Sequence, residues 1–108
     1  MINSKQKGKR GELMLVKELN SYGFNTRRTN QYCGNTGEAS DLVGLPKIHI
    51  EAKNTERLNI YDAVDQAKRD AREGEIPTVF HKKNRKEWLV TMPLTEWVKL
   101  YKAFIHKG

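Results

Sequence analysis

Apolar residues recur every three or four positions in three segments of the chain, which is the spacing that places them on one face of a helix. This pattern predicts helices over residues 8–22, over residues 60–73 and from residues 93–95 onward. Asn59 is a suitable N-cap for the second helix, and Gly74 and Pro77 follow its end. The apolar stripe of the first helix consists of Val16 and Leu19, with Leu13 beside it. The stripes of the second and third helices are Ile60, Ala63, Val64, Ala67 and Ala71, and Trp97, Leu100, Tyr101 and Phe104.

Shorter runs between the helices carry the composition and alternation of β-strands. The predicted strands cover residues 25–31, 40–45, 47–53, 78–81 and 87–92. The Gly and Asn content of residues 33–39 predicts a loop, and Gly23 predicts the end of the first helix. The order α-β-β-β-α-β-β-α is satisfied by an α/β fold with a single mixed β-sheet flanked by helices. The second helix would link strands across that sheet with right-handed sense.

The size and charge of the chain narrow its class. A length of 108 residues suits a single domain, with residues 1–7 as a mobile basic arm. Lys and Arg number 20 against 13 Asp and Glu, a net charge of +7, which favours a polyanionic partner such as nucleic acid and equally serves solubility. Cys33, the only cysteine, excludes an internal disulfide and a Cys-based zinc site. The basic N-terminus precedes no long apolar run, which argues against a secretory signal or membrane span and makes a cytoplasmic location the default.

The candidate chemistry lies on the strand over residues 47–53. Because side chains alternate along a strand, His49, Glu51 and Lys53 share one face. An acid and a lysine fixed two residues apart suit a metal-dependent hydrolase, in which the acid holds the ion and the lysine contacts the attacking water. Antiparallel pairing would bring Asp41 beside Glu51. His49 shares this face, although a solvated or packed histidine is the more frequent case.

Glu12 projects from the apolar stripe of the first helix. A carboxylate at the edge of an apolar face calls for a partner such as a cation. The alternative is that Glu12 only favours the positive N-terminus of its helix. Likewise, Asp41 could cap a turn, and Glu51 and Lys53 could form an exposed cross-strand pair.

These residues resemble the PD-(D/E)xK nuclease superfamily, with Glu12 on a first helix, Asp41 on a strand and Glu51-x-Lys53 on the next. The segment from Lys9 to Glu12 looks like that of archaeal-type Holliday-junction resolvases and their phage relatives, with the small VRR-NUC nucleases a close second. The resemblance implies a restriction-endonuclease-like core and a DNA endonuclease that is structure-selective. Ser40 stands where the superfamily name has Pro.

The resemblance also implies residue roles. Asp41 and Glu51 would bind Mg²⁺, or Mn²⁺ as a substitute, with help from the backbone carbonyl of Ala52. Glu12 would complete the site directly or through a water. Such a hard cation takes oxygen ligands and lowers the pKa of bound water.

Two further residues receive roles from the resemblance. Lys53 would orient or deprotonate the water that attacks phosphorus. Gln66, on the second helix, matches a position where many relatives carry a Gln near the site, and a surface helical Gln is an equal alternative.

Basic residues gather in three clusters that suit phosphate contacts with branched or duplex DNA. The predicted DNA-binding residues are Lys7, Lys9 and Arg10; Arg27 and Arg28; Asn35 in the loop; and Lys82, Lys83, Arg85 and Lys86. A junction-cutting enzyme needs paired cuts, so we expect a C2 homodimer, with the apolar third helix as its surface. The alternatives are a noncatalytic nucleic-acid-binding domain that retains the fold and a small interaction protein. The sequence does not distinguish a junction from a flap, a duplex or a single strand, nor DNA from RNA.

Overall fold

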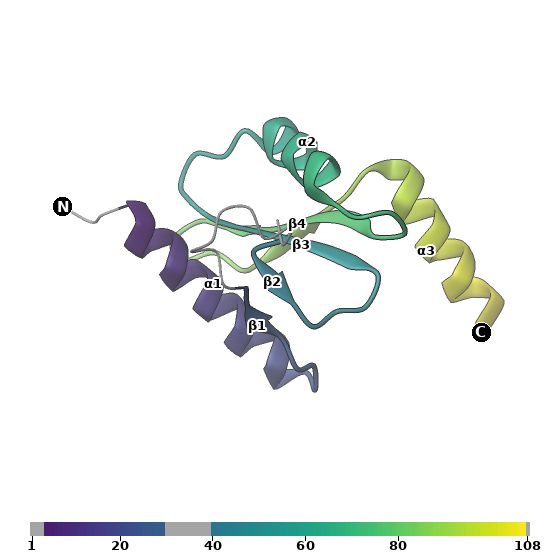
Figure 1. Cartoon of the computed structure of the whole chain (residues 1–108), viewed down its shortest axis with the longest axis horizontal. Coiled ribbons are helices and arrows are strands. Elements are labelled where there is room, and N and C mark those ends of the chain that lie inside the picture. The colour runs from purple at the N-terminus through teal and green to yellow at the C-terminus, as the bar shows by residue number, and fades with distance from the viewer. Residues whose placement is uncertain (1–3, 30–39, 108) are drawn as a thin grey trace.

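A computed structural model of the chain describes residues 4–29 and 40–107 (Figure 1). In these two described ranges, three helices and five strands follow one another in the predicted order. The elements are α1 (Ser4–Ser21), β1 (Arg27–Arg28), β2 (Leu42–Val43), β3 (Ile48–Asn54), α2 (Ile60–Asp70), β4 (Ile76–Lys82), β5 (Leu89–Thr91) and α3 (Leu94–Lys107). The α/β fold class is therefore confirmed.

The five strands form one mixed sheet in the order β1-β2-β3-β4-β5. The pairs β1–β2, β2–β3 and β4–β5 are antiparallel, whereas β3 and β4 run parallel. The parallel pair requires a crossover, which α2 provides. The helix predicted to link strands across the sheet therefore does so.

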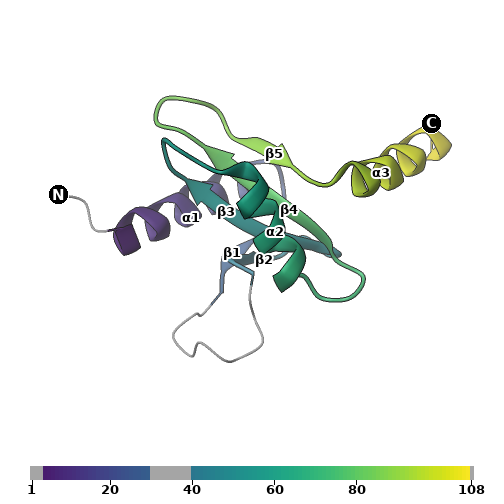
Figure 2. The same ribbon diagram turned by 90° about the horizontal axis from the view of Figure 1, so that it is seen from above.

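Two helices cover opposite faces of the sheet (Figures 1 and 2). On one face, Leu15 of α1 packs with Leu42, Ile50 and Phe80. On the other face, Ala63 and Ala67 of α2 pack with Val79. The small alanine side chains let α2 approach the sheet closely, as Figure 2 shows for its position across β3 and β4.

Several element boundaries differ from the predicted ones. Helix α1 begins at Ser4, before the predicted start at residue 8, so residues 4–7 belong to this helix and not to the predicted mobile arm. Gly23, with φ of 100°, follows the end of the helix as predicted. Val16 and Leu19 pack against the core, which confirms the predicted stripe at these two positions. Leu15, which the prediction left out, is buried, and Leu13 is 49% exposed. Helix α2 ends at Asp70 rather than at residue 73, because Ala71 is extended.

The strands also differ in length. β4 begins at Ile76 and includes Pro77, which was predicted to lie before the strand. β1, β2 and β5 are shorter than predicted, and β3 covers nearly its predicted range. The predicted loop over residues 33–39 and the end of the first predicted strand lie outside the described residues.

Helix α3 stands apart from the sheet (Figure 1). None of its described side chains is buried. Trp97 is 49% exposed and Phe104 is 74% exposed. This aromatic stripe is therefore not part of the hydrophobic core. None of the helices in the described residues is long and apolar enough to cross a membrane.

Gly11 allows α1 to lie directly on the end of β3. A Cβ atom added at Gly11 would lie only 2.6 Å from Cβ of Asn54, whereas one added at Gly8 would meet no atom within 4 Å. This close approach fixes the position of the next residue, Glu12, relative to β3.

We predict opposite effects for two glycine substitutions in α1. Gly11→Ala should lower the free energy of unfolding by about 1–3 kcal/mol, because the added methyl group would force the backbone of α1 or the side chain of Asn54 to move. Gly8→Ala should raise it by about 0.5–1 kcal/mol, because alanine favours the helix. Chemical denaturation measures both values. Equal changes in the two variants would show that α1 does not approach β3 in this way.

Candidate active site

The hairpin of β2 and β3 brings Asp41 to Glu51. The backbone N–H of Asp41 donates to the carbonyl oxygen of Ile50 at 3.0 Å, and Leu42 pairs with Ile50 in register. The Asp41 carboxylate oxygen Oδ2 in turn accepts a hydrogen bond from the backbone N–H of Ala52 at 2.7 Å. The carboxylate of Asp41 is thereby held against the backbone on the C-terminal side of Glu51, as antiparallel pairing predicted.

Glu51 is held by a buried histidine. Its side chain is 1% exposed, and its Oε1 lies 2.9 Å from Nε2 of His49. His49 is itself fully buried, and its Nδ1 lies 2.8 Å from Oγ of Ser40. Because an ionised carboxylate only accepts hydrogen bonds, Nε2 of His49 is the donor. Ser40, His49 and Glu51 thus form a hydrogen-bonded chain that fixes the orientation of the carboxylate.

The environment of Glu51 disfavours its charge. Burial raises the pKa of this carboxyl group, the hydrogen bond from His49 lowers it, and the negative charge of Asp41 raises it again. The net pKa is raised above its ordinary value. A bound cation would relieve both the burial cost and the repulsion from Asp41.

Lys53 lies beside Glu51 and is positioned by α2. Its Nζ lies 3.8 Å from Oε2 of Glu51 and donates a hydrogen bond of 3.1 Å to Oε1 of Gln66. Glu51 and Lys53 face α2, because their register partners on β4 are Val79, which packs on α2, and His81. The structure therefore brings Gln66 to the predicted site residues.

Glu12 reaches the same region from α1 but has a different partner. Its Oε1 accepts a hydrogen bond and ion pair from Nε of Arg28 at 2.7 Å. Burial raises the pKa of Glu12, Arg28 lowers it and Asp41 raises it further, with a raised net value. Glu12 is thus close enough to Asp41 to feel its charge. The expected cationic partner of Glu12 is Arg28, a residue that was predicted to contact DNA.

The donor set suits a hard cation. Carboxylate oxygens of Asp41 and Glu51, with the Ala52 carbonyl on the same strand segment, are the ligand types that Mg²⁺ prefers. The repulsion of Glu51 and Glu12 by Asp41 is consistent with a site that a cation completes. Among residues 4–29 and 40–107, however, no three His, Cys, Asp or Glu side chains form a cluster ready to hold a metal.

The remaining predicted DNA contacts lie on exposed surfaces. Lys9 and Arg10 are exposed on α1, and Arg27 is exposed on β1. The turn between β4 and β5 exposes Lys83, Arg85 and Lys86, with Lys82 partly buried at the end of β4. Asn35 and the side chain of Lys7 lie outside the described part of the chain.

Comparison with known proteins places this arrangement in a family. The family model described as "Phage putative PDDEXK endonuclease" matches residues 3–107. The chain belongs to this family. No curated protein sequence matches it.

A solved structure supports the same family. The chain is similar to Archaeoglobus fulgidus Hjc, a Holliday junction resolvase from an archaeal hyperthermophile, with 27% sequence identity and a TM-score of 0.60. The match covers 80% of this chain and 75% of Hjc. The resemblance to PD-(D/E)xK nucleases, which generally use divalent metals, is therefore confirmed, and together these matches support endonuclease activity on DNA.

We predict that Glu51→Gln gains stability relative to the wild type as pH rises in metal-free buffer. A carboxyl group whose folded-state pKa is raised contributes stability below its unfolded-state pKa, and this contribution is lost as pH rises through the folded-state value. Glutamine does not ionise but keeps an acceptor for His49. Chemical denaturation at several values between about pH 4 and pH 7 measures the difference in free energy of unfolding between Glu51→Gln and the wild type. A difference that stays constant over this range would contradict the raised pKa.

Proposed function

We propose that this protein is a divalent-metal-dependent DNA endonuclease that hydrolyses phosphodiester bonds. The observation that carries the proposal is the placement of Asp41, directly before β2, beside Glu51 and Lys53 on β3. Nζ of Lys53 lies 3.8 Å from Oε2 of Glu51. Family membership supports the endonuclease chemistry.

The proposed metal is Mg²⁺, with Mn²⁺ as a substitute. Asp41, Glu51 and the Ala52 carbonyl would hold it, with Glu12 contributing directly or through a water. When bound, such an ion lowers the pKa of a bound water and offsets negative charge on the transition state.

The protein side chains have separate tasks in this proposal. His49 and Ser40 keep the Glu51 carboxylate in one orientation, because both nitrogens of the imidazole are engaged. Lys53 orients the attacking water or takes its proton, and adds a positive charge where the phosphorane becomes negative. The hydrogen bond from Lys53 to Gln66 keeps the ammonium group beside Glu51.

We further propose that the substrate is branched DNA. The similarity to Hjc, itself a Holliday junction resolvase, supports this choice. The exposed cations on α1 and at the β4–β5 turn would contact phosphates without reading base sequence. The alternative is a noncatalytic nucleic-acid-binding domain, but three carboxylates that repel phosphate would weaken such a domain. A phage endonuclease of this kind would act in the cytoplasm of the bacterial or archaeal host.

We infer that α3 forms a homodimer surface. Its face exposes Trp97, Tyr101 and Phe104, and the ring centroids of the first two lie 5.2 Å apart in a stacked arrangement. Leu89 and Val90 of the edge strand β5 are each 54% exposed as well. An apolar patch on both an unpacked helix and a sheet edge suits a self-complementary C2 interface, which a junction with paired cleavage sites would require.

We predict that Glu51→Ala abolishes metal-dependent DNA cleavage and that Lys53→Ala slows it by about 10²–10⁴-fold, because each removes a group that acts on the reacting phosphate or water. Cutting of supercoiled plasmid and of synthetic branched DNA, with Mg²⁺ and with EDTA, measures both. Lys68→Ala, an exposed lysine on α2, is the matched control and should cut normally. Cleavage that survives Glu51→Ala or EDTA would reject the proposed mechanism.

We predict a dimer in sedimentation experiments at micromolar concentration, and a monomer for Phe104→Glu, because a charge would be buried at the interface. Lys102→Ala, which changes an exposed residue away from the aromatic stripe, should leave the dimer intact. A wild-type monomer would reject the dimer without affecting the nuclease proposal.

A further inference from the structure

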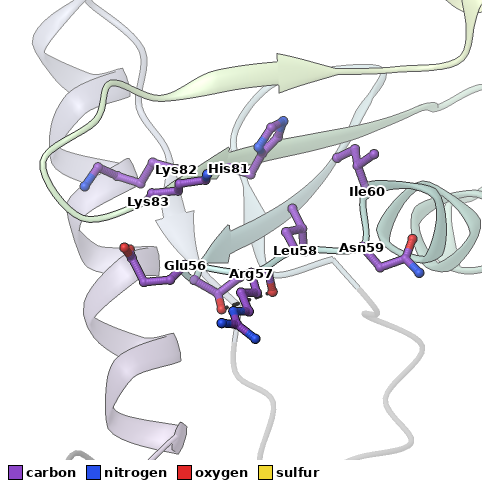
Figure 3. A pocket seen from close by; sticks show the side chains of 9 residues that line it. Glu56, Arg57, Leu58, Asn59, Ile60, His81, Lys82 and Lys83 are labelled. Carbon is purple, nitrogen blue, oxygen red and sulfur yellow. Dashed lines mark hydrogen bonds between the residues drawn. The ribbon is translucent and has the colours of Figure 1, made fainter.

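A hollow of about 630 Å³ opens between the loop that follows β3 and the end of β4 (Figure 3). One wall is the loop from Thr55 to Asn59 with the start of α2, and the other is the end of β4 from His81 onward. Figure 3 shows Leu58 between the loop and β4, with Arg57 on the loop side and Lys82 on the strand side.

The hollow carries an excess of positive charge. Arg57, Lys82 and Lys83 line it, against one acid, Glu56. Glu56 is engaged, since its Oε2 accepts a hydrogen bond of 2.5 Å from the backbone N–H of Asn84. None of the three cations forms an ion pair with any residue in the described ranges.

Register places the β4 wall of the hollow next to the candidate catalytic lysine. On the parallel strands β3 and β4, Lys53 pairs with His81, and Asn54 pairs with Lys82. Neighbouring strands lie about 4.8 Å apart, so the floor of the hollow begins one strand away from Lys53. A DNA strand with its scissile phosphate at Lys53 would therefore bring a neighbouring phosphate to the hollow.

We propose that this hollow is a binding subsite for the backbone phosphate that lies one or two nucleotides from the scissile phosphate on the cleaved strand. The inference rests on the proposed function and adds Arg57 to the predicted DNA contacts, in one subsite with Lys82 and Lys83. The subsite would fix the position of the strand along the active site, since phosphate contacts position a substrate without reading its sequence.

The lining favours a phosphate over a base. Unpaired bases are held mainly by stacking on aromatic side chains. The residues that line this hollow include no Phe, Tyr or Trp, and the ring of His81 is held by a hydrogen bond of 2.8 Å between its Nε2 and Oγ1 of Thr91. Its apolar members Leu58 and Ile60 are aliphatic, whereas its cationic side chains are of the kind that neutralise phosphate.

The test measures equilibrium binding of a synthetic four-way junction in EDTA by fluorescence anisotropy, so that binding is separate from cleavage. Arg57→Ala should reduce the slope of log K against log salt concentration by about 1, the effect of losing one phosphate contact. Lys82→Ala should have a similar effect. Lys68→Ala, which removes an exposed cation of α2 outside the hollow, is the control and should leave the slope unchanged.

A second arm locates the phosphate. Junctions that carry one uncharged methylphosphonate at successive positions are bound by the wild type and by Arg57→Ala. At one position within two nucleotides of the cut mapped with Mg²⁺, the methylphosphonate should weaken wild-type binding several-fold and leave Arg57→Ala binding unchanged. The subsite would be overturned if Arg57→Ala lowers the affinity equally for intact DNA and for methylphosphonate DNA at every position. It would also be overturned if Arg57→Ala and Lys68→Ala change the affinity equally.

The outcomes separate the two proposals. The subsite would be rejected, and the endonuclease retained, if the junction is cut with Mg²⁺ but no methylphosphonate position affects the wild type and Arg57→Ala differently. The proposed endonuclease would be rejected if a methylphosphonate position affects the wild type but not Arg57→Ala and the junction is not cut at any metal concentration. That result would still show that the hollow binds a backbone phosphate. Absence of DNA binding would reject both.

Discussion

The hydrogen bond from the Ala52 backbone N–H to the Asp41 carboxylate, 2.7 Å long, holds the candidate site together. It joins an acid directly before β2 to the strand that carries Glu51 and Lys53. This bond depends on the register of β2 against β3, where Leu42 pairs with Ile50. A shift by one residue would turn Glu51 and Lys53 toward α1 and the hydrophobic core on that side. The burial of Ile50 and Leu42 in that core opposes such a shift, so packing on one face of the sheet fixes chemistry on the other.

Ionising Glu51 in this environment costs free energy, and the proposed function explains why the site has this arrangement. Glu51 is nearly fully buried and close to Asp41, and both conditions raise its pKa. The fold offsets this cost in part with His49 and Lys53, which lie within 4 Å of its two oxygens. A divalent cation would offset much more, since its charge favours the ionised form of every nearby carboxylate. The site is thus least favourable without a cation, as expected for residues arranged for chemistry rather than for stability.

Much of the fold could be predicted from the sequence because local patterns determine it. The order of elements, the N-cap at Asn59, the stop at Gly23 and the neighbourhood of Asp41 and Glu51 all follow from periodicity, capping chemistry and the alternation of strands. Element ends were less predictable, because α2 ends where Ala71 becomes extended and no residue type requires that change at this position. The exposure of α3 could not be derived from its apolar stripe alone, because such a stripe does not say whether the same chain or a second subunit covers it.

The partners of individual site residues were the least predictable feature. Arg28 was predicted to contact DNA, but it pairs with Glu12 through the juxtaposition of α1 and β1, which no local pattern encodes. His49 was correctly placed on the face of Glu51, although its full burial depends on tertiary packing. Ser40, which stands where the superfamily name has Pro, lies 2.8 Å from Nδ1 of His49, a contact that a proline side chain would not make. This substitution therefore has a structural role in the present chain.

The most direct measurement of the central claim is anomalous X-ray scattering from crystals of the protein soaked in Mn²⁺. The account predicts one dominant anomalous peak in contact with carboxylate oxygens of Asp41 and Glu51, at the carbonyl of Ala52, and no such peak in crystals of Glu51→Gln. A peak bound elsewhere, or an empty site between Asp41 and Glu51 in well-ordered crystals at millimolar Mn²⁺, would contradict it.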